Sequence, residues 1–250
     1  MSALADNLSR VEDEIVAACR AAGRPRGEVE LMAISKVHPS TAMVEAAALG
    51  LHLFGENRVQ EFAGKSAELS VSRVPGMERT ARSQMRVHLI GHLQSNKAAK
   101  AVEVFDGIDS LDSLKLAERL NTAAGEQALT QGHKLPVLIE IKLSQEETKE
   151  GLVPDSSELA ELLEKLPSLK HLEAQGLMTI AAWGAPEPET RACFRSLRVL
   201  RDKLAQAHPK LNLPVLSMGM SGDFALAIAE GATRIRVGTA LFGKRPGYAQ

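Results

Sequence analysis

Short apolar runs alternate with longer amphipathic segments along the whole chain. The runs at 28–35, 135–144 and 172–180 are rich in Val, Ile and Leu and have the length of buried strands. Between such runs, segments such as 40–50 and 187–207 repeat apolar residues three and four positions apart, as helices with one buried face do. Regular alternation of strand and helix is typical of a parallel sheet.

The number of strand candidates predicts how the sheet closes. They lie at 28–35, 51–56, 86–91, 104–110, 135–144, 172–180, 214–220 and 233–243. Eight strand–helix units in a chain of 250 residues predict an α/β fold, a single (β/α)8 barrel covering residues 1–250. The amphipathic segment 1–24 predicts an extra N-terminal helix. An open doubly wound sheet is the weaker alternative, because no strand–helix turn carries the G-x-G-x-x-G pattern.

Charge and composition exclude several functions. The formal net charge is −1 and aromatic residues make up 3% of the chain, which argues against nucleic acid or an anionic membrane as the main partner. No apolar run has membrane-spanning length, and the N-terminus lacks a signal-peptide pattern. Cys19 and Cys193 form neither a disulfide framework nor a zinc signature, so we expect a cytoplasmic protein with reduced thiols. The polar stretch 70–85 predicts a mobile surface loop.

Glycine and polar residues follow several predicted strands at their carboxyl ends. In a barrel these ends meet on one rim, where functional residues cluster. The residues concerned are Lys36, Gly55, Glu56, Asn57, Gly91, His92, Gln94, Ser217 to Ser221, Arg236, Gly238 and Thr239. Their convergence is a stronger signal for a site than any one motif.

The loop SMGMSGD at 217–223 has the features of an anion cradle. Gly219 allows close approach of the backbone to a ligand, and Ser221 is placed to cap the next helix, whose amides favour a phosphate. The turn RVGT at 236–239 adds donors from the last strand. Arg236 lies nearer the rim than Arg234 and is the better ligand candidate. The alternatives are two ordinary turns with a helix cap, and arginines that pair with carboxylates between barrel and helices.

Lys36 ends the first predicted strand, where a buried ammonium is unfavourable unless it is paired or used in chemistry. It is either a surface lysine or a partly desolvated amine that forms a Schiff base with a carbonyl. Opposite a phosphate cradle, such an amine describes a site for pyridoxal 5′-phosphate (PLP). An aldolase acting on a sugar phosphate has a similar signature.

His88 and His92 are four residues apart, as in a metal pair on a helix, but here they lie on a strand and the following turn. No third ligand is evident, so metal binding is disfavoured. No G-x-S-x-G elbow is present, so a serine hydrolase has no support.

Together these residues resemble the PLP homeostasis protein family, known as YggS in bacteria and as PROSC or PLPBP in animals. Four blocks carry the resemblance: AISKVHP at 33–39, FGENRVQE at 54–61, HLIGHLQSNK at 88–97 and SMGMSGDFALAIAEGATRIRVGTALFG at 217–243. GLMTI at 176–180 is a weaker block. The resemblance implies a fold similar to the N-terminal barrel of alanine racemase.

The resemblance also implies a site. Lys36 is the expected covalent PLP lysine, and Arg236 the residue near the pyridine nitrogen, where it disfavours ring protonation and electron-sink chemistry. The phosphate binders implied are Ser217, Ser221, Gly238 and Thr239, and the pocket-lining residues are Asn57 and Met218. The implied function is to hold PLP as a lysine aldimine and to take part in intracellular vitamin B6 and amino-acid homeostasis, with PLP-dependent apoenzymes as possible partners and no catalysis.

Two departures from the family's sequence pattern and one alternative function stay open. Glu140, Ile141 and Lys142 stand where the family usually has Gln-Val-Asn, and Lys142 offers a second amine. The stretch MTIAAWG at 178–184 lacks a proline that the family often has. A PLP-dependent amino-acid racemase would need a second base such as tyrosine, and the one tyrosine is Tyr248 in the tail. The protein is expected to be a monomer or a weak homodimer.

Overall fold

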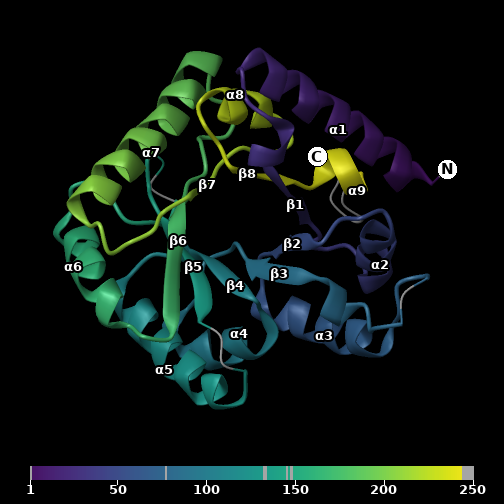
Figure 1. Ribbon diagram of the computed structural model, residues 1–250, viewed down its shortest axis with the longest axis horizontal. Helices are drawn as coiled ribbons and strands as arrows, with labels where there is room; N and C mark the ends of the chain where they lie inside the picture. The colour runs from purple at the N-terminus through teal and green to yellow at the C-terminus, as the bar shows by residue number, and fades with distance from the viewer. Residues whose placement is uncertain (1, 77, 132–133, 145, 147–148, 244–250) are drawn as a thin grey trace.

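Eight parallel strands close into a barrel in the computed structural model, which describes residues 2–76, 78–131, 134–144, 146 and 149–243 (Figure 1). The strands are β1 (Glu30–Ile34), β2 (Leu53–Glu56), β3 (Arg86–Leu89), β4 (Gly107–Leu111), β5 (Leu135–Glu140), β6 (Leu172–Met178), β7 (Val215–Ser217) and β8 (Arg234–Val237). Each strand pairs with the next, and pairing of β8 with β1 completes the ring. The predicted barrel is confirmed, and closure rules out the open sheet.

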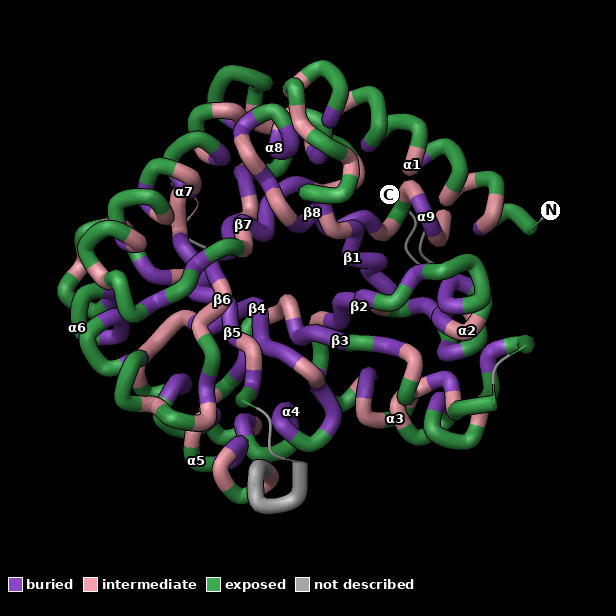
Figure 2. Tube along the Cα trace, viewed as in Figure 1, coloured by how far each residue is buried: buried purple, intermediate pink, exposed green. Residues whose placement is uncertain are grey.

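Helices surround the barrel, and Figure 2 shows buried strands inside and exposed helix faces outside. The helices are α1 (Ala3–Ala21), α2 (Ser40–Ala48), α3 (Val59–Val71), α4 (Ala98–Val104), α5 (Leu114–Gln131), α6 (Ser157–Lys165), α7 (Glu187–Ala207), α8 (Phe224–Ala229) and α9 (Thr239–Phe242). The extra N-terminal helix is confirmed as α1, which packs against α8 and α9 through a face that includes the buried Val11 and Ile15. Cys19 and Cys193 carry free thiols. None of the described helices combines the length and apolar character needed to cross a membrane.

The stretch 70–85 is more structured than the sequence predicts. Helix α3 continues to Val71, and an isolated antiparallel bridge joins Arg73 to Thr80. Val74 and Ala81, which belong to this segment, are buried. A surface loop is therefore present between these residues, and it is anchored to the protein by apolar contacts at both ends.

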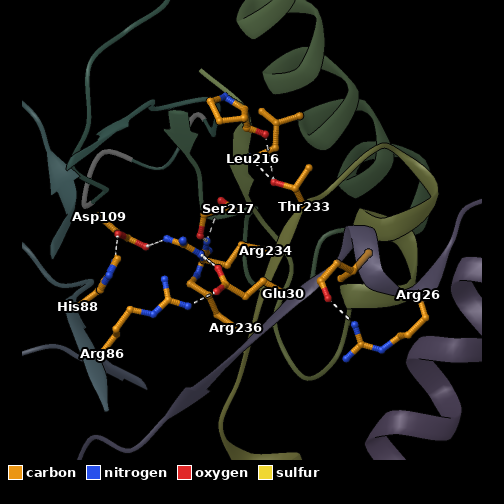
Figure 3. A network of polar contacts seen from close by, with 12 residues as sticks. Arg26, Glu30, Arg86, His88, Asp109, Leu216, Ser217, Thr233, Arg234 and Arg236 are labelled. Atoms are coloured by element: carbon orange, nitrogen blue, oxygen red, sulfur yellow. Dashed lines mark hydrogen bonds and ion pairs between the residues drawn. The ribbon is translucent and has the colours of Figure 1, made fainter. Parts of the chain in front are cut away.

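Charged side chains fill the barrel at the amino ends of its strands (Figure 3). Asp109 on β4 accepts a hydrogen bond from Arg234 Nη1 at 3.1 Å and lies 2.8 Å from Nδ1 of His88. Arg234 Nε also donates to Glu30 at 2.9 Å, and Arg86 donates to the other oxygen of Glu30 at 2.6 Å. We call these five residues the ion-pair plug. Because β4 and β8 are opposite strands, Arg234 crosses the barrel interior to reach Asp109, so the alternative of a carboxylate partner between barrel and helices does not hold for this residue.

The ion-pair plug predicts how stability depends on pH. Burial alone would raise the pKa of Asp109, but His88 and Arg234 outweigh it and hold that pKa below its ordinary value. A depressed folded-state pKa stabilises the protein above the unfolded pKa of about 3.9, and this contribution is lost as pH falls through the folded value. We expect the free energy of unfolding in urea to fall below about pH 4. Asp109→Asn should have a flatter profile in that range, and parallel profiles for the two proteins would contradict the assignment.

Candidate functional site

The residues singled out by sequence lie at the carboxyl end of the barrel, opposite the ion-pair plug. Lys36 lies in the turn between β1 and α2 and is half-buried. The others follow or end the strands β2, β7 and β8: Asn57, Ser217, Met218, Ser221, Arg236, Gly238 and Thr239. The register Ala33↔Val237 sets the Lys36 turn beside the start of α9, and the rings of His38 and Phe242, 5.1 Å apart, pack across this junction. The structure thus brings the turn that carries Lys36 and the candidate cradle together.

The backbone on the C-terminal side of Lys36 is strained. Val37 has φ of 63°, a left-handed conformation that is rare for a β-branched residue. Its N–H donates to Oε1 of Glu61 at 2.6 Å, and the same oxygen accepts from Lys65 Nζ at 2.9 Å. Strain of this kind persists only where neighbouring contacts hold it. Here the contact between Val37 and Glu61 holds the backbone next to Lys36.

The backbone on the N-terminal side of Lys36 is also held by Lys65. Lys65 Nζ donates to the Ser35 carbonyl at 3.0 Å and to Glu56 Oε1 at 2.8 Å, and the Ser35 hydroxyl donates to Glu56 Oε1 at 2.7 Å. Glu56 is fully buried, and burial raises its pKa although Lys65 opposes the shift. We call Glu56, Glu61 and Lys65 the lysine clamp. Sequence reasoning missed Lys65, which has no local signature; Glu61 lies in a quoted block without an assigned role.

Lys65→Met tests the lysine clamp. It leaves the buried Glu56 without its cationic partner, and loss of one partner of a buried pair costs about 3–5 kcal/mol of folding free energy. A Lys65→Met/Glu56→Gln double variant should recover part of that loss in urea unfolding. Lys115→Met, on the exposed face of α5, is the matched control and should change stability by less than about 0.5 kcal/mol. A Lys65→Met protein as stable as the control would contradict the account.

The candidate anion cradle joins two loops through one hydroxyl. Oγ of Ser221 accepts from the backbone N–H of Gly238 at 3.3 Å and from that of Ala240 at 3.4 Å. The expectation that Ser221 caps the next helix is wrong, because α8 begins at Phe224 and its N-cap is Asp223. Ser221 instead ties the loop after β7 to the first turn of α9. The hydroxyl keeps its own O–H for donation to a ligand.

Gly219 is required by the shape of this loop. Its φ is 94°, and a Cβ atom at this position would lie 2.6 Å from Cβ of Ala227 and 3.0 Å from Cα of Phe224. We expect Gly219→Ala to lower the free energy of unfolding by about 1–3 kcal/mol through strain and displacement of the loop. Gly222→Ala is the control, since a Cβ there meets nothing within 4 Å. Equal stability of the two variants, measured by urea unfolding, would show that the loop is not constrained in this way.

Arg236 is a fixed cation at the base of the site. It is 4% exposed, and its Nη1 donates to the carbonyl and the hydroxyl of Ser217 at 2.7 and 2.8 Å. Its Nη2 donates to the Thr179 carbonyl at 2.8 Å. Burial lowers the pKa of Arg236, while nearby carboxylates, first Asp109, oppose this. The described residues accept three of the five N–H bonds that a guanidinium can donate, which leaves donors for a ligand.

Asn57 supplies an unused polar atom. Its Oδ1 is buried and has no hydrogen-bond partner among the described residues. Its backbone packs closely on the next loop, since a Cβ on Gly91 would lie 2.4 Å from the Asn57 carbonyl oxygen. Buried polar atoms are normally satisfied, so this oxygen is available to accept a hydrogen bond from a bound ligand. Together with the cradle, the fixed cation and Lys36, this atom fits a phosphorylated aldehyde such as PLP.

The two sequence departures lie on the other side of the same rim. Glu140 and Lys142 line a cavity of about 210 Å³ together with His92, Lys149 and Glu150. The sequence left open where the second amine, that of Lys142, would lie. The structure places Lys142 in the wall of this cavity. Glu140 is buried, and desolvation followed by the nearby Asp112 raises its pKa to about 7.

The two histidines have separate surroundings. His88 pairs with Asp109 in the ion-pair plug, whereas His92 pairs with Asp112. The expectation that no further ligand lies near is wrong for His92, because Asp112 and Glu150 come from distant parts of the sequence to join it. Loop positions of this kind have no sequence signal. Tyr248, the candidate racemase base, lies outside the described residues.

Comparisons with known proteins agree with the barrel fold. The family model described as alanine racemase, N-terminal domain, matches residues 6–246. The chain is also similar to alanine racemase of Clostridium difficile, with 18% identity, a TM-score of 0.68 and coverage of 97% of this chain and 58% of that one. That likeness concerns the fold alone.

Two relatives with higher sequence identity show which protein family the chain belongs to. The pyridoxal phosphate homeostasis protein of Pseudomonas aeruginosa is 41% identical over 246 residues, covering 98% of this chain and 97% of the relative. The structure of PipY from Synechococcus elongatus PCC7942 with PLP bound is 42% identical, with a TM-score of 0.79 and coverage of 96% and 100% of the two chains. The chain therefore belongs to the pyridoxal phosphate homeostasis protein family.

Proposed function

We propose that the protein binds PLP at the carboxyl end of its barrel, holds it covalently through Lys36, and takes part in PLP and amino-acid homeostasis without being an enzyme. The observation that carries the proposal is the convergence of three groups on one rim: the Lys36 amine, the cradle tied by Ser221, and the fixed cation Arg236. The PipY relative, whose structure contains PLP, supports the same ligand.

Each residue has a role in this proposal. Donors at Ser221, Gly238 and Thr239 bind the phosphate, and Ser217, whose oxygens accept from Arg236, still offers its O–H. The Lys36 amine condenses with the aldehyde to form a C=N bond and release one water molecule. When bound, PLP supplies a reactive aldehyde and a ring that can accept electrons. Arg236 faces the ring nitrogen and keeps it unprotonated, while Asn57 and Met218 line the pocket.

The test is a titration of the purified protein with PLP, followed by visible absorption. We expect one PLP per chain, and we expect Ser221→Ala to weaken binding about tenfold, which corresponds to about 1.4 kcal/mol for one lost phosphate contact. Ser168→Ala, on an exposed turn after α6, is the control. A colourless protein that takes up no PLP would favour a lysine-dependent aldolase acting on a phosphorylated substrate.

Further features belong to the same proposal. Recipients of the PLP would be apoenzymes that require it, and mixing the loaded protein with such an apoenzyme should restore its activity. The proposed location is the cytoplasm, where the free Cys19 and Cys193 stay reduced. A monomer or weak homodimer is expected. The racemase alternative draws support only from a shared fold, which does not establish activity.

A further inference from the structure

A second group of polar side chains lies on the rim away from the cradle. His92, Asp112 and Glu150 follow β3, β4 and β5, whereas the cradle follows β7 and β8. One ligand atom from each of the three lies within 4.8 Å of those of the other two. Asp112 Oδ2 lies 2.9 Å from Nδ1 of His92, so these two ligand atoms are near enough to each other to bind one ion.

Glu140 is an independent sign that this cluster takes a ligand. The residue is 7% exposed, and its carboxylate accepts no hydrogen bond from the described residues. After burial, the charges that shift its pKa are those of Asp112, Arg236, Glu150 and His92, so the carboxylate lies near the cluster. Its side chain also lines the cavity of about 210 Å³ that His92 and Glu150 line. A buried carboxylate without a partner is costly, and a bound cation would remove that cost.

Lys149, which lines this cavity, has partners other than Glu140. Lys149 Nζ donates to the carbonyl of Ala181 at 2.6 Å and pairs with Glu146 at 3.5 Å, so its charge is directed to other acceptors. Glu140, Glu150 and His92 therefore line one cavity with Asp112 beside them, and Arg236 is the largest cationic cause among those that shift the pKa of Glu140.

We infer that this cluster binds one divalent transition-metal cation, with His92, Asp112 and Glu150 as ligands and Glu140 as the fourth donor. A mixed set of one imidazole and several carboxylates suits Mn²⁺ or Zn²⁺, whereas Ca²⁺ and Mg²⁺ prefer oxygen donors alone. Ligand atoms within 4.8 Å of one another can surround a single ion. An organic ammonium would have no need of the imidazole. The ion would sit on the same rim as the proposed PLP site, where β3, β4 and β5 end.

The test is binding of Mn²⁺ to the chelator-treated full-length protein, measured by the loss of the free-ion signal in electron paramagnetic resonance. We expect one Mn²⁺ per chain, displaced stoichiometrically by Zn²⁺. Asp112→Asn/Glu150→Gln should weaken binding at least 100-fold. Electron spin-echo measurements should detect one coordinated nitrogen, and this signal should disappear in His92→Gln. Glu103→Gln, an acidic residue on the outer face of α4, is the matched control and should bind as the parent does.

The same titration on Lys36→Ala separates this site from metal chelation by PLP. The inference requires unchanged Mn²⁺ affinity in that variant, whether or not it takes up PLP. Absence of stoichiometric binding up to 1 mM of either metal, roughly −4.1 kcal/mol, would overturn it. So would affinity that is unaffected by the cluster variants, or a cavity that binds methylammonium in place of the metals.

Discussion

Lys36→Ala is expected to remove all covalently held PLP while leaving the fold intact. The substitution deletes the amine and keeps the cradle tied by Ser221 and the cation Arg236, so weak noncovalent binding should remain. We expect the Schiff-base absorption to be absent and the Kd for PLP to rise about 100-fold, equivalent to about 2.7 kcal/mol. Absorption spectra and equilibrium dialysis with PLP measure the two effects.

The controls for this variant address the competing amines. Lys142→Met removes the lysine at the neighbouring cavity and should leave the absorption of bound PLP unchanged. A Lys36→Ala protein that retained full Schiff-base absorption would move the attachment to another lysine, with Lys142 the first to examine. Unaltered urea unfolding of Lys36→Ala would show that the loss is chemical and does not reflect an unfolded site.

Asp109→Ala is expected to cause the largest loss of stability among single substitutions in the barrel interior. Asp109 is 1% exposed and is the shared partner of His88 and Arg234, which are also buried. Its removal leaves the Arg234 charge with Glu30 as its remaining ion-pair partner among the described residues. Breaking a buried pair in this way costs about 3–5 kcal/mol, and the cavity adds to that cost. Urea unfolding of the purified variant measures it.

Two further variants separate the charge effect from simple loss of packing. Asp109→Asn keeps the size and some hydrogen bonds, so it should be destabilised less than Asp109→Ala at pH 7. Asp106 pairs with Arg82 and is more exposed than Asp109. Asp106→Ala should therefore lower the free energy of unfolding by no more than about 1 kcal/mol. If Asp109→Ala were as mild as Asp106→Ala, the ion-pair plug would not be a stabilising feature of the barrel.

Much of the barrel could be predicted because its signals are local. Strand candidates at 135–144 and 172–180 became β5 and β6, and the amphipathic pattern at 187–207 matches α7 from end to end. The strand predicted at 233–243 was too long: β8 ends at Val237, and Thr239–Phe242 form α9, whose four residues are too few to show a helical period. The capping role assigned to Ser221 failed because tertiary contacts moved the start of α8 to Phe224.

The site was predictable only in part. Strand-end positions identified Lys36, Arg236 and the loop at 217–223 from sequence, because parallel strands bring their carboxyl ends together. The partners that hold Lys36 in place could not be found this way, since Lys65 lies on a helix and reaches the turn only in the folded chain. Likewise, the joining of Glu150 with His92 depends on how two loops fold over the rim.

The central claim is most directly tested by borohydride reduction of the purified, PLP-loaded protein followed by peptide mapping. Reduction converts the C=N bond into a stable secondary amine and marks the lysine that held the cofactor. The account predicts one pyridoxyl group per chain, on the peptide that contains Lys36. A label on another lysine, or PLP that dissociates unreduced, would contradict it.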